Sequence, residues 1–328
     1  SKIDTYGFQR SESFDYTTYE EFMSDYLAVL ARRAGKWRNV IDYNSKVDRN
    51  AKVKRYCRKG IPGEHRAMVW MSISGAEEQM AGNPTLYSTL LEAPQDQELV
   101  DTIKQDIHRT FPDNIFFGDM SNPQTMRRPL QNVLIAFAHH NKDIGYCQGL
   151  NFITGMLLLV VKDEHKVFWL LHTLVNKYLP DYYSKGLEGL KVDQDVLGQL
   201  VKIKAPELYK HMDELGLMWC IVSTKWFICC FADVLPIETV LRIWDSLFYE
   251  GSKIIFRVSI TLILHNQSKL MKCRHLAEIL DTFKEIPKDP LATRCHDFMQ
   301  SIFKIPGSFP QAQIKSLRKR YKKQQENG

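Results

Sequence analysis

The feature that most constrains this chain is the helical spacing of its apolar side chains, which recurs along most of its length. Between residues 97 and 109, for example, Leu99, Ile103 and Ile107 fall on one helix face. Stretches that alternate between apolar and polar residues, as half-buried strands do, are scarce. Glycine and proline stand mainly at the junctions between periodic segments. The sequence therefore predicts an all-α protein.

Helix boundaries follow from the same pattern and from the residues that interrupt it. Residues 1–16 look irregular, and the polar segment 41–52 is interpreted as a linker or mobile loop. An aromatic stripe on the helix predicted at 17–38 indicates that this helix packs on the rest of the protein. The other predicted helices cover 53–59, a segment from Pro62, 84–93, 97–109, 123–140, 148–161, 163–179, 192–215, 220–233, 237–249, 253–270, 274–285, 290–303 and 310–324.

Charge is balanced over most of the chain. The net charge is +6 over 328 residues, and the excess lies in one cluster near the C-terminus. Without that cluster the chain carries 38 basic and 38 acidic residues, so no broad nucleic-acid-binding face is predicted. The cluster consists of Lys315, Arg318, Lys319, Arg320, Lys322 and Lys323.

The cysteines and the apolar runs bear on the compartment. Seven cysteines include no Cys-x-x-Cys pair, and the first residues contain no apolar targeting segment, which favours reduced thiols and a cytoplasmic location. The apolar run Phe152–Val161 has about half of the ~20 residues that a membrane span needs. The run Trp219–Leu235 contains Lys225 and Asp233. Both runs are therefore predicted to be buried helices, with no transmembrane segment.

Two polar side chains stand where helices are expected to meet loops. Arg109 falls in the last turn of the helix predicted at 97–109, and Asp106 precedes it by three residues on the same face. Gln148 stands at the junction between a loop and the following apolar helix. Taken alone, Asp106 and Arg109 would form a surface ion pair worth under ~1 kcal/mol. A planar cation and an amide on two helix ends are, however, what a protein needs to enter another protein's phosphate site.

The sequence also bears on three other kinds of site. His139, His140, Asp143 and Cys147 could suggest a metal site, but adjacent histidines point to different helix faces. Cys147 and His140 could form a nucleophile and its base, although a structural cysteine is the commoner case. A glycine-rich phosphate loop of the Walker type is absent from the sequence.

Arg66 and Trp70 form a second pair at helical spacing. The arginine stem could cover the indole ring as ordinary packing. The same contact could instead hold the neighbouring loops. The sequence supports both interpretations equally.

The combination of motifs resembles the TBC domain, the family of Rab GTPase-activating proteins. The resemblance covers about residues 55–260, with the expected motif order and separations. Leu150 departs from the family, which usually has methionine there, and this apolar exchange changes little. The matching motifs are Lys59-Gly60-Ile61-Pro62 with Arg66-x-x-x-Trp70, Ile103-x-x-Asp106-x-x-Arg109-Thr110-Phe111-Pro112, Gly145-Tyr146-Cys147-Gln148-Gly149-Leu150-Asn151, Arg242-Ile243-Trp244-Asp245 and Glu250-Gly251.

The resemblance implies a V-shaped, all-helical domain of two halves with a GTP-bound Rab protein docked in its groove. Residues 55–260 would form the core, and its first half, which carries the motifs of Arg109 and Gln148, would extend to about residue 190. Residues 1–54 would be an N-terminal helical extension with a linker. Residues 261–328 would complete the domain and end in the basic tail 314–328.

The resemblance also implies roles. Arg109 would be an arginine finger, Gln148 would replace the Rab protein's own glutamine, and Asp106 would orient Arg109. The chain would then activate the Rab enzyme without being an enzyme itself, in vesicle trafficking, and would need no cofactor because GTP and Mg²⁺ belong to the Rab protein. The residues expected to support this site are Arg66, Trp70, Tyr146 and Asn151.

Two alternatives stay open from the sequence. The chain could hold a Rab protein or another partner without accelerating hydrolysis. In the basic tail, Ile314, Leu317 and Tyr321 lie at helical spacing among the positive charges. A solvated basic helix end explains this pattern, and weak peripheral contact with an anionic membrane is the sharper alternative.

Overall fold

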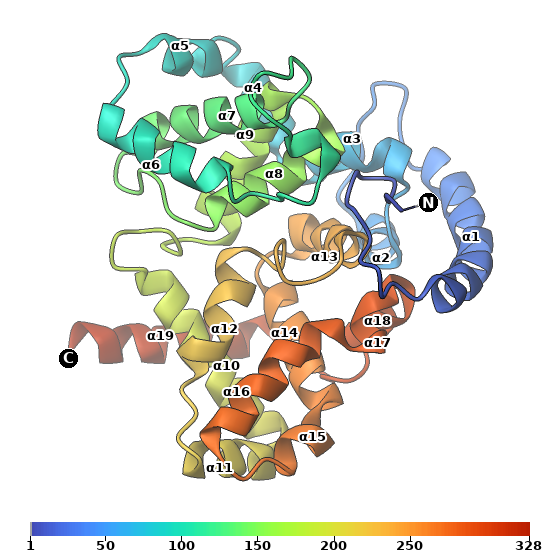
Figure 1. The fold of residues 1–328 in the computed structure, drawn as a ribbon, viewed down its shortest axis with the longest axis vertical. Coiled ribbons are helices and arrows are strands. Elements are labelled where there is room, and N and C mark those ends of the chain that lie inside the picture. The colour runs from blue at the N-terminus through green and yellow to red at the C-terminus, as the bar shows by residue number, and fades with distance from the viewer. Residues whose placement is uncertain (1) are drawn as a thin grey trace. The chain divides into compact units, whose positions relative to one another are not determined.

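The computed structural model describes residues 2–328 and consists of helices joined by turns (Figure 1). Within those residues, β-type pairing is limited to two isolated bridges, Ile3–Gln9 and Phe8–Asn114. The prediction of an all-α protein is confirmed. The chain forms two compact units, the first ending at Lys177 and the second beginning at Tyr178.

The first unit contains α1, whose 23 residues make it the longest helix among residues 2–328, and eight shorter α-helices. Its helix α7 packs against α5, α6, α8 and α9, and α3 packs against α4, α8 and α9. Its elements are α1 (Tyr16–Arg38), α2 (Ala51–Lys59), α3 (Gly63–Ser74), α4 (Ala76–Gly82), α5 (Leu86–Glu92), α6 (Gln97–Ile107), η1 (Ile115–Phe117), α7 (Arg127–His140), α8 (Leu150–Val161), α9 (Glu164–Thr173) and the π-helical turn η2 (Leu174–Tyr178) that leads into the second unit.

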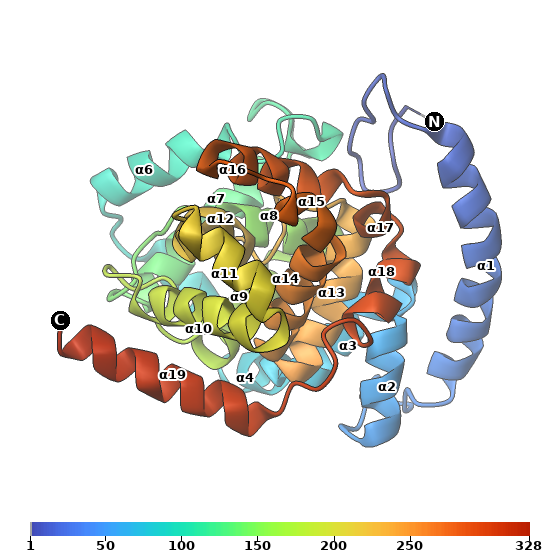
Figure 2. The same ribbon diagram turned by 90° about the horizontal axis from the view of Figure 1, so that it is seen from below.

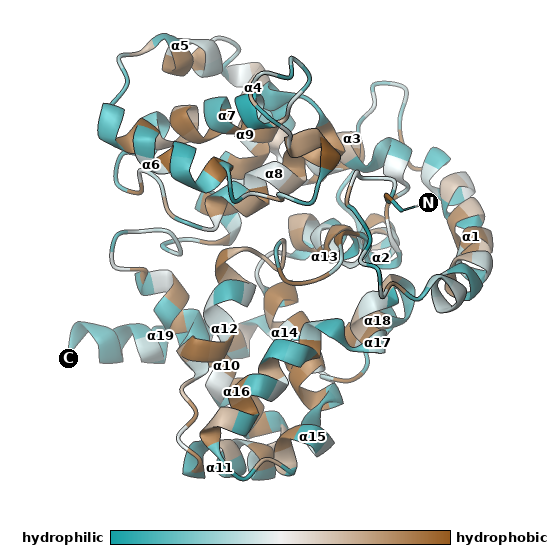
Figure 3. Cartoon of the chain, in the orientation of Figure 1, coloured by the Kyte–Doolittle hydropathy of each residue, from teal (hydrophilic) through white to brown (hydrophobic). Residues whose placement is uncertain are grey.

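Helix α8 lies in the interior of the first unit because it is apolar almost all round. Residues Leu150–Leu159 are buried except Phe152. Figure 3 shows both teal and brown residues along α6 and α7, as expected of helices with one buried and one exposed face. The apolar run Phe152–Val161 is therefore a buried helix, as predicted. Among the residues described, no helix is both long and apolar enough to span a membrane.

Helix α1 is attached to the first unit through its C-terminal end. Trp37 is fully buried, and its indole nitrogen donates a hydrogen bond of 3.0 Å to the carbonyl of Gly60, just after α2. Figure 2 shows α1 and α2, the two helices that this contact links. The segment predicted to be a linker also has fixed contacts near its end, because the amide of Val47 lies 3.1 Å from the hydroxyl of Ser72. Residues before α2 are thus tied to the C-terminal part of α3.

The second unit is built around α10, which packs against α11, α12, α14 and α19, and around α13, which packs against α14 and α18. Buried aromatic side chains carry hydrogen bonds to backbone carbonyls, for example from Trp244 Nε1 to Cys230 at 2.9 Å. Its elements are α10 (Glu188–Lys204), α11 (Pro206–Glu214), α12 (Trp219–Ile228), α13 (Ile237–Glu250), α14 (Lys253–His265), α15 (Gln267–Met271), α16 (Leu276–Glu285), η3 (Ile286–Lys288), α17 (Pro290–Thr293), α18 (Cys295–Ile302) and α19 (Gln311–Glu326).

The basic tail is an integral helix of the second unit. Ile314 and Leu317 are buried, so the apolar face of α19 is already covered. Arg318 donates to both carboxylate oxygens of Asp193 on α10, at 2.8 and 2.9 Å, and to the hydroxyl of Ser252 at 2.7 Å. Interpreting all six basic residues as a solvated helix end was therefore wrong for Arg318.

The helices differ from the prediction in three places. The predicted helix 192–215 is two helices, because Pro206 starts α11 and pushes Ala205 to an extended φ of −144°. The predicted helix 97–109 ends at Ile107. The helix α4 was not predicted. It has only seven residues, with Gly75 as its N-cap and Gly82 as its last residue.

The first unit contains a histidine that burial keeps neutral. The ring of His172 lies 5.0 Å from that of His140 and 5.5 Å from that of Trp169, and its Nδ1 lies 3.1 Å from the amide nitrogen of Asn176. Burial, with the neighbouring His140, lowers the pKa of His172 to about 4. Because the unfolded chain binds a proton near pH 6.5 and the folded chain does not, protonation favours unfolding.

We expect the free energy of unfolding to decline as the pH falls from about 6.5 towards 4. Replacing His172→Asn removes the titrating group, so the decline over this range becomes smaller. Urea unfolding at pH 7 and at pH 5 measures the change. The variant His275→Asn, which replaces an exposed histidine, serves as the matched control. A pH dependence in His172→Asn as steep as that in His275→Asn would contradict the prediction.

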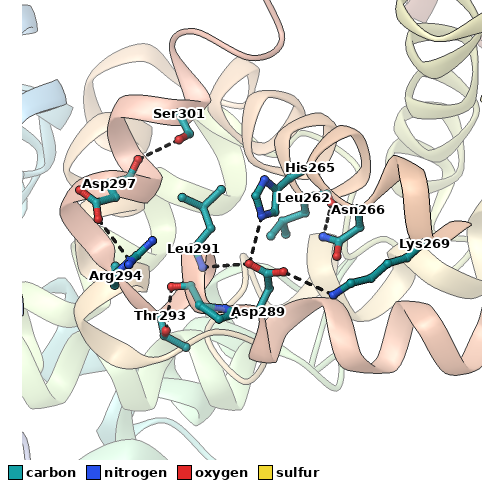
Figure 4. A network of polar contacts seen from close by, with 11 residues as sticks. Leu262, His265, Asn266, Lys269, Asp289, Leu291, Thr293, Arg294, Asp297 and Ser301 are labelled. Atoms are coloured by element: carbon teal, nitrogen blue, oxygen red, sulfur yellow. Dashed lines mark hydrogen bonds and ion pairs between the residues drawn. The ribbon is translucent and has the colours of Figure 1, made fainter. Parts of the chain in front are cut away.

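In the second unit, Asp289 at the start of α17 contacts side chains of α14 and α15 (Figure 4). One carboxylate oxygen accepts from the amide of Leu291 at 2.8 Å and lies 3.2 Å from Nε2 of His265, and the other lies 3.8 Å from Nζ of Lys269. The side chain is only 9% exposed. Asp289 thus caps α17 and ties it to the end of α14.

We expect Asp289→Ala to lower the free energy of unfolding by about 1–2 kcal/mol, because the cap and the contacts with His265 and Lys269 are lost together. Asp297→Ala is the matched control, since its pair with Arg294 is about half exposed on both sides and is worth under ~1 kcal/mol. Denaturant unfolding of both variants compares them. Equal losses would show that Asp289 contributes no more than a surface charge.

Candidate functional site

The candidate site is centred on the carboxylate of Asp106, near the end of α6. One oxygen accepts a hydrogen bond from the guanidinium of Arg109, and the other accepts one from the hydroxyl of Tyr146. The side chain of Asp106 is 7% exposed, whereas that of Arg109 is 65% exposed. A buried carboxylate therefore holds a cation that reaches into solvent.

The backbone explains how Arg109 comes to point outward. Helix α6 ends at Ile107 with His108 as its C-cap, so Arg109 lies in the turn after the helix. The prediction that Arg109 lies in the last turn of the helix was wrong. The amide of Arg109 still bonds to the carbonyl of Asp106 at 3.1 Å. The two side chains consequently meet as predicted, with Arg109 at the start of a loop.

Tyr146 is fixed as a hydrogen-bond donor. Burial and its bond to Asp106 raise the pKa of Tyr146 well above its ordinary value of 10. The phenol is therefore protonated at any pH at which the protein is used, and it always donates to the carboxylate. Tyr146 and Arg109 thus occupy the two oxygens of Asp106 from opposite loops of the site.

A chain of hydrogen bonds joins the loop of Arg109 to that of Gln148. The hydroxyl of Thr110 donates to the carbonyl of Asp106 at 2.8 Å and accepts from the amide nitrogen of Asn151 at 2.9 Å. The side-chain oxygen of Asn151 accepts from the amide of Gly149 at 2.9 Å. Gln148, which precedes Gly149, is exposed. Both exposed residues are thus carried by one buried hydrogen-bonded framework.

The loop after Arg109 has a backbone conformation that needs support. Phe111 is buried and has a φ of +48°, a left-handed conformation that costs a non-glycine residue about 1–3 kcal/mol. Its ring packs on Phe117 and Phe152, with centroids 5.6 Å away in each case. Gly155 of α8 makes room, because a Cβ there would lie 3.0 Å from the ring of Phe111 and 3.2 Å from Thr110.

Arg66 and Trp70 lie on α3, which packs against α8 and α9 in the first unit. Both are buried, Arg66 at 7% exposure and Trp70 at 0%. These positions agree with the packing interpretation. A role for the two residues in holding the loops stays a prediction.

The site does not favour the alternatives built on Cys147. Burial and the charge of Asp106 raise the pKa of Cys147 to about 11, so at neutral pH it is a thiol and a weak nucleophile. Within residues 2–328, no group of three or more His, Cys, Asp or Glu side chains is arranged to hold a metal ion.

The sequence analysis assigned no role to three contributors to the site, and it named Thr110 and Phe111 only as parts of a motif. Thr110 bridges Asp106 and Asn151, Phe111 supplies the strained turn, and Gly155 admits both of them. A glycine within an otherwise apolar helix was the one available signal, since it often marks a close approach of two segments. The partnership of Thr110 and Asn151 could not be read from spacing, because 41 residues separate them.

Known protein families and curated proteins match the part of the chain that contains the candidate site. The model of the Rab-GTPase-TBC domain matches residues 63–271. The chain is 52% identical to Growth hormone-regulated TBC protein 1-A of Danio rerio, over 97% of this chain and 89% of that protein. It is 34% identical to the GTPase-activating protein MSB4 of Saccharomyces cerevisiae, over 83% of this chain and 63% of that protein.

Solved structures show the same fold. The crystal structure of the Chlamydomonas flagellar RabGAP TBC domain is similar with a TM-score of 0.78 and 30% identity, over 92% of this chain and 99% of that chain. The Ypt/Rab-GAP domain of Gyp1p is similar with a TM-score of 0.69 at 18% identity, over 89% of this chain and 99% of that chain. Because the family model matches residues 63–271, the chain belongs to the Rab-GTPase-TBC domain family.

Proposed function

We propose that this chain accelerates GTP hydrolysis by a Rab-family GTPase, into whose nucleotide site it inserts Arg109 and Gln148. The observation that carries the proposal is the exposed guanidinium of Arg109, held by the buried Asp106 within the framework that also carries Gln148. Family membership and the names of the similar proteins support it. The reaction takes place on the partner, so the chain acts as an activator in trans, with vesicle trafficking as the implied setting.

The chemistry suits these two side chains. Phosphoryl transfer needs positioning and charge neutralisation more than covalent help, and GTP and Mg²⁺ are supplied by the partner. A planar guanidinium matches the charge that develops on phosphate oxygens. An amide can orient the attacking water, because it offers both a donor and an acceptor. Arg109 would serve the first role and Gln148 the second.

Asp106 and Tyr146 would prepare Arg109 for this role. The bond to Asp106 restricts the rotamers of a long side chain before the partner arrives, which reduces the entropy lost on binding. Tyr146 occupies the second carboxylate oxygen and so limits the ways in which Arg109 can pair with it. Replacing either residue would loosen the cation without removing it.

We expect Arg109→Ala to lower kcat for a responsive Rab protein by about 10³–10⁵-fold, because an arginine finger in trans contributes a factor of this size. Release of phosphate from a panel of GTP-loaded Rab proteins measures it. Thermal unfolding checks that the variant is folded at the assay temperature, because the substitution removes one of the two side-chain partners of the buried Asp106. Arg38→Ala, which removes an exposed arginine at the end of α1, is the control and keeps full activity.

Full activity of Arg109→Ala on every Rab protein that binds would refute the catalytic role. Stable binding that survives the joint replacement Arg109→Ala and Gln148→Ala, with no turnover by the wild type, would instead indicate a binding module.

We expect Asn151→Ala to lower kcat by at least about tenfold although both exposed residues remain, because the loops lose their shared bonds. The free energy of unfolding should fall by about 1–3 kcal/mol, since buried partners are left unpaired. Thr154→Ala is the matched control on α8, because its hydroxyl bonds only locally to the carbonyl of Leu150 at 2.7 Å. Thr154→Ala should lose stability and keep its kcat; parallel losses of kcat in both variants would contradict the linking role.

A further inference from the structure

The segment Ile3–Gln9 forms a compact turn that lies outside the matched residues 63–271. The side chain of Asp4 accepts hydrogen bonds from the amides of Tyr6 at 2.8 Å and Phe8 at 2.9 Å, and the amide of Asp4 donates to the carbonyl of Phe8 at 2.9 Å. The sequence suggested an irregular segment here, because neither helical nor strand periodicity is present. We call this segment the N-terminal turn.

The N-terminal turn binds the loop that follows Arg109. The amide of Gln9 donates to the carbonyl of Asp113 at 3.0 Å, and the amide of Ile115 donates to the carbonyl of Gly7 at 2.9 Å. Asn114 is 3% exposed, and its side chain donates to the carbonyl of Tyr6 at 3.0 Å. The contacts of the turn are thus concentrated within six residues of Arg109.

Gly7 permits this close approach. Its φ is +94°, and a Cβ at this position would lie 2.5 Å from the ring of Phe116 and 2.9 Å from the side-chain oxygen of Asn114. Any larger residue would strain the turn and push it away from the loop. The turn is therefore fitted to the loop in both conformation and shape.

Phe8 packs on Phe111, the residue with the strained backbone. Its ring meets that of Phe111 edge-on, with centroids 5.2 Å apart and an angle of 85° between the planes. Phe111 keeps its left-handed conformation only while its surroundings hold it there. Two of its ring neighbours, Phe117 and Phe152, belong to the site region, and Phe8 is added by the N-terminal turn. Arg109 lies two residues before Phe111, so its backbone position depends on the same packing.

We propose that the N-terminal turn is a positioning element for Arg109, with Phe8 as its principal residue. By holding Phe111 and Asn114, the turn fixes the loop from which the guanidinium extends and so keeps it beside Asp106. This inference rests on the proposed function, because the effect of the turn would be measured as the rate of GTP hydrolysis by the Rab protein. It extends the working part of the chain beyond the matched residues to Ile3.

The test compares Phe8→Ala with the matched control Phe14→Ala. Phe14 belongs to the same N-terminal region, but its ring contacts Tyr16 at 4.9 Å and Tyr19 at 5.4 Å. We expect Phe8→Ala to lower kcat about tenfold, since misplacement of a catalytic group by ~1 Å has effects of this order or larger. In Phe8→Ala, the KM for the GTP-loaded Rab protein should change less than about twofold. Phe14→Ala should leave both kcat and KM unchanged. Phe8→Tyr, which keeps the ring, should have the kcat of the wild type.

A double-mutant comparison tests whether Phe8 acts through Arg109. In the Arg109→Ala background, Phe8→Ala should cause no further loss of the residual rate. A further loss as large as that in the wild-type background, or a kcat of Phe8→Ala equal to that of the wild type, would overturn the inference. If Arg109→Ala itself has full activity, the proposed function fails; if Arg109→Ala is inactive and Phe8→Ala is fully active, only the positioning role fails.

Hydrogen exchange provides a measurement that does not depend on activity. The amide of Ile115, which bonds to Gly7, should exchange faster in Phe8→Ala than in Phe14→Ala. Thermal unfolding of each variant shows whether it is folded at the assay temperature. If Phe8→Ala is unfolded, Gly7→Ala replaces it, because it displaces the turn and keeps the ring; unchanged exchange and unchanged kcat in that variant would overturn the proposal.

Discussion

The buried carboxylate of Asp106 is the interaction on which the candidate site depends. A carboxylate that is 7% exposed needs compensating partners, and it finds them in Arg109, which is a cation, and in Tyr146, which is a permanent donor. The backbone carbonyl of the same residue receives the hydroxyl of Thr110. One residue therefore determines both the direction of the guanidinium and the course of the loop behind it, and the desolvation of its charge is what makes these bonds strong.

The loop that carries Arg109 combines strain with close packing. The left-handed Phe111 is unfavourable by itself, and the absence of a side chain at Gly155 lets its ring and Thr110 approach α8. A relaxed loop would allow a long, exposed side chain to sample many positions. A loop held by three aromatic rings and a buried threonine restricts that freedom, so the strain is retained where precise placement of one side chain matters.

Local patterns predicted the helices well and the long-range contacts poorly. The helical spacing of apolar residues predicted the elements, and the three-residue separation of Asp106 and Arg109 predicted their contact. The prediction was wrong where Pro206 divides a long periodic run and where the short α4 lies between two glycines. Tyr146 lies 40 residues from Asp106, and Phe8 lies far from Phe111 in the sequence. Such pairings depend on the packing of whole helices, which one sequence does not display.

The identity of the exposed cation follows from the geometry around it. A guanidinium carries five N–H donors in a rigid fork, so Arg109 can bond to Asp106 through one terminal nitrogen while the rest of the fork faces solvent. A lysine ammonium has three donors on one nitrogen, so a carboxylate and a second acceptor would have to crowd around the same atom. The guanidinium separates its donors over three nitrogens, so one edge can stay on Asp106 while another edge faces solvent. A planar, branched cation therefore suits this position better than a compact one.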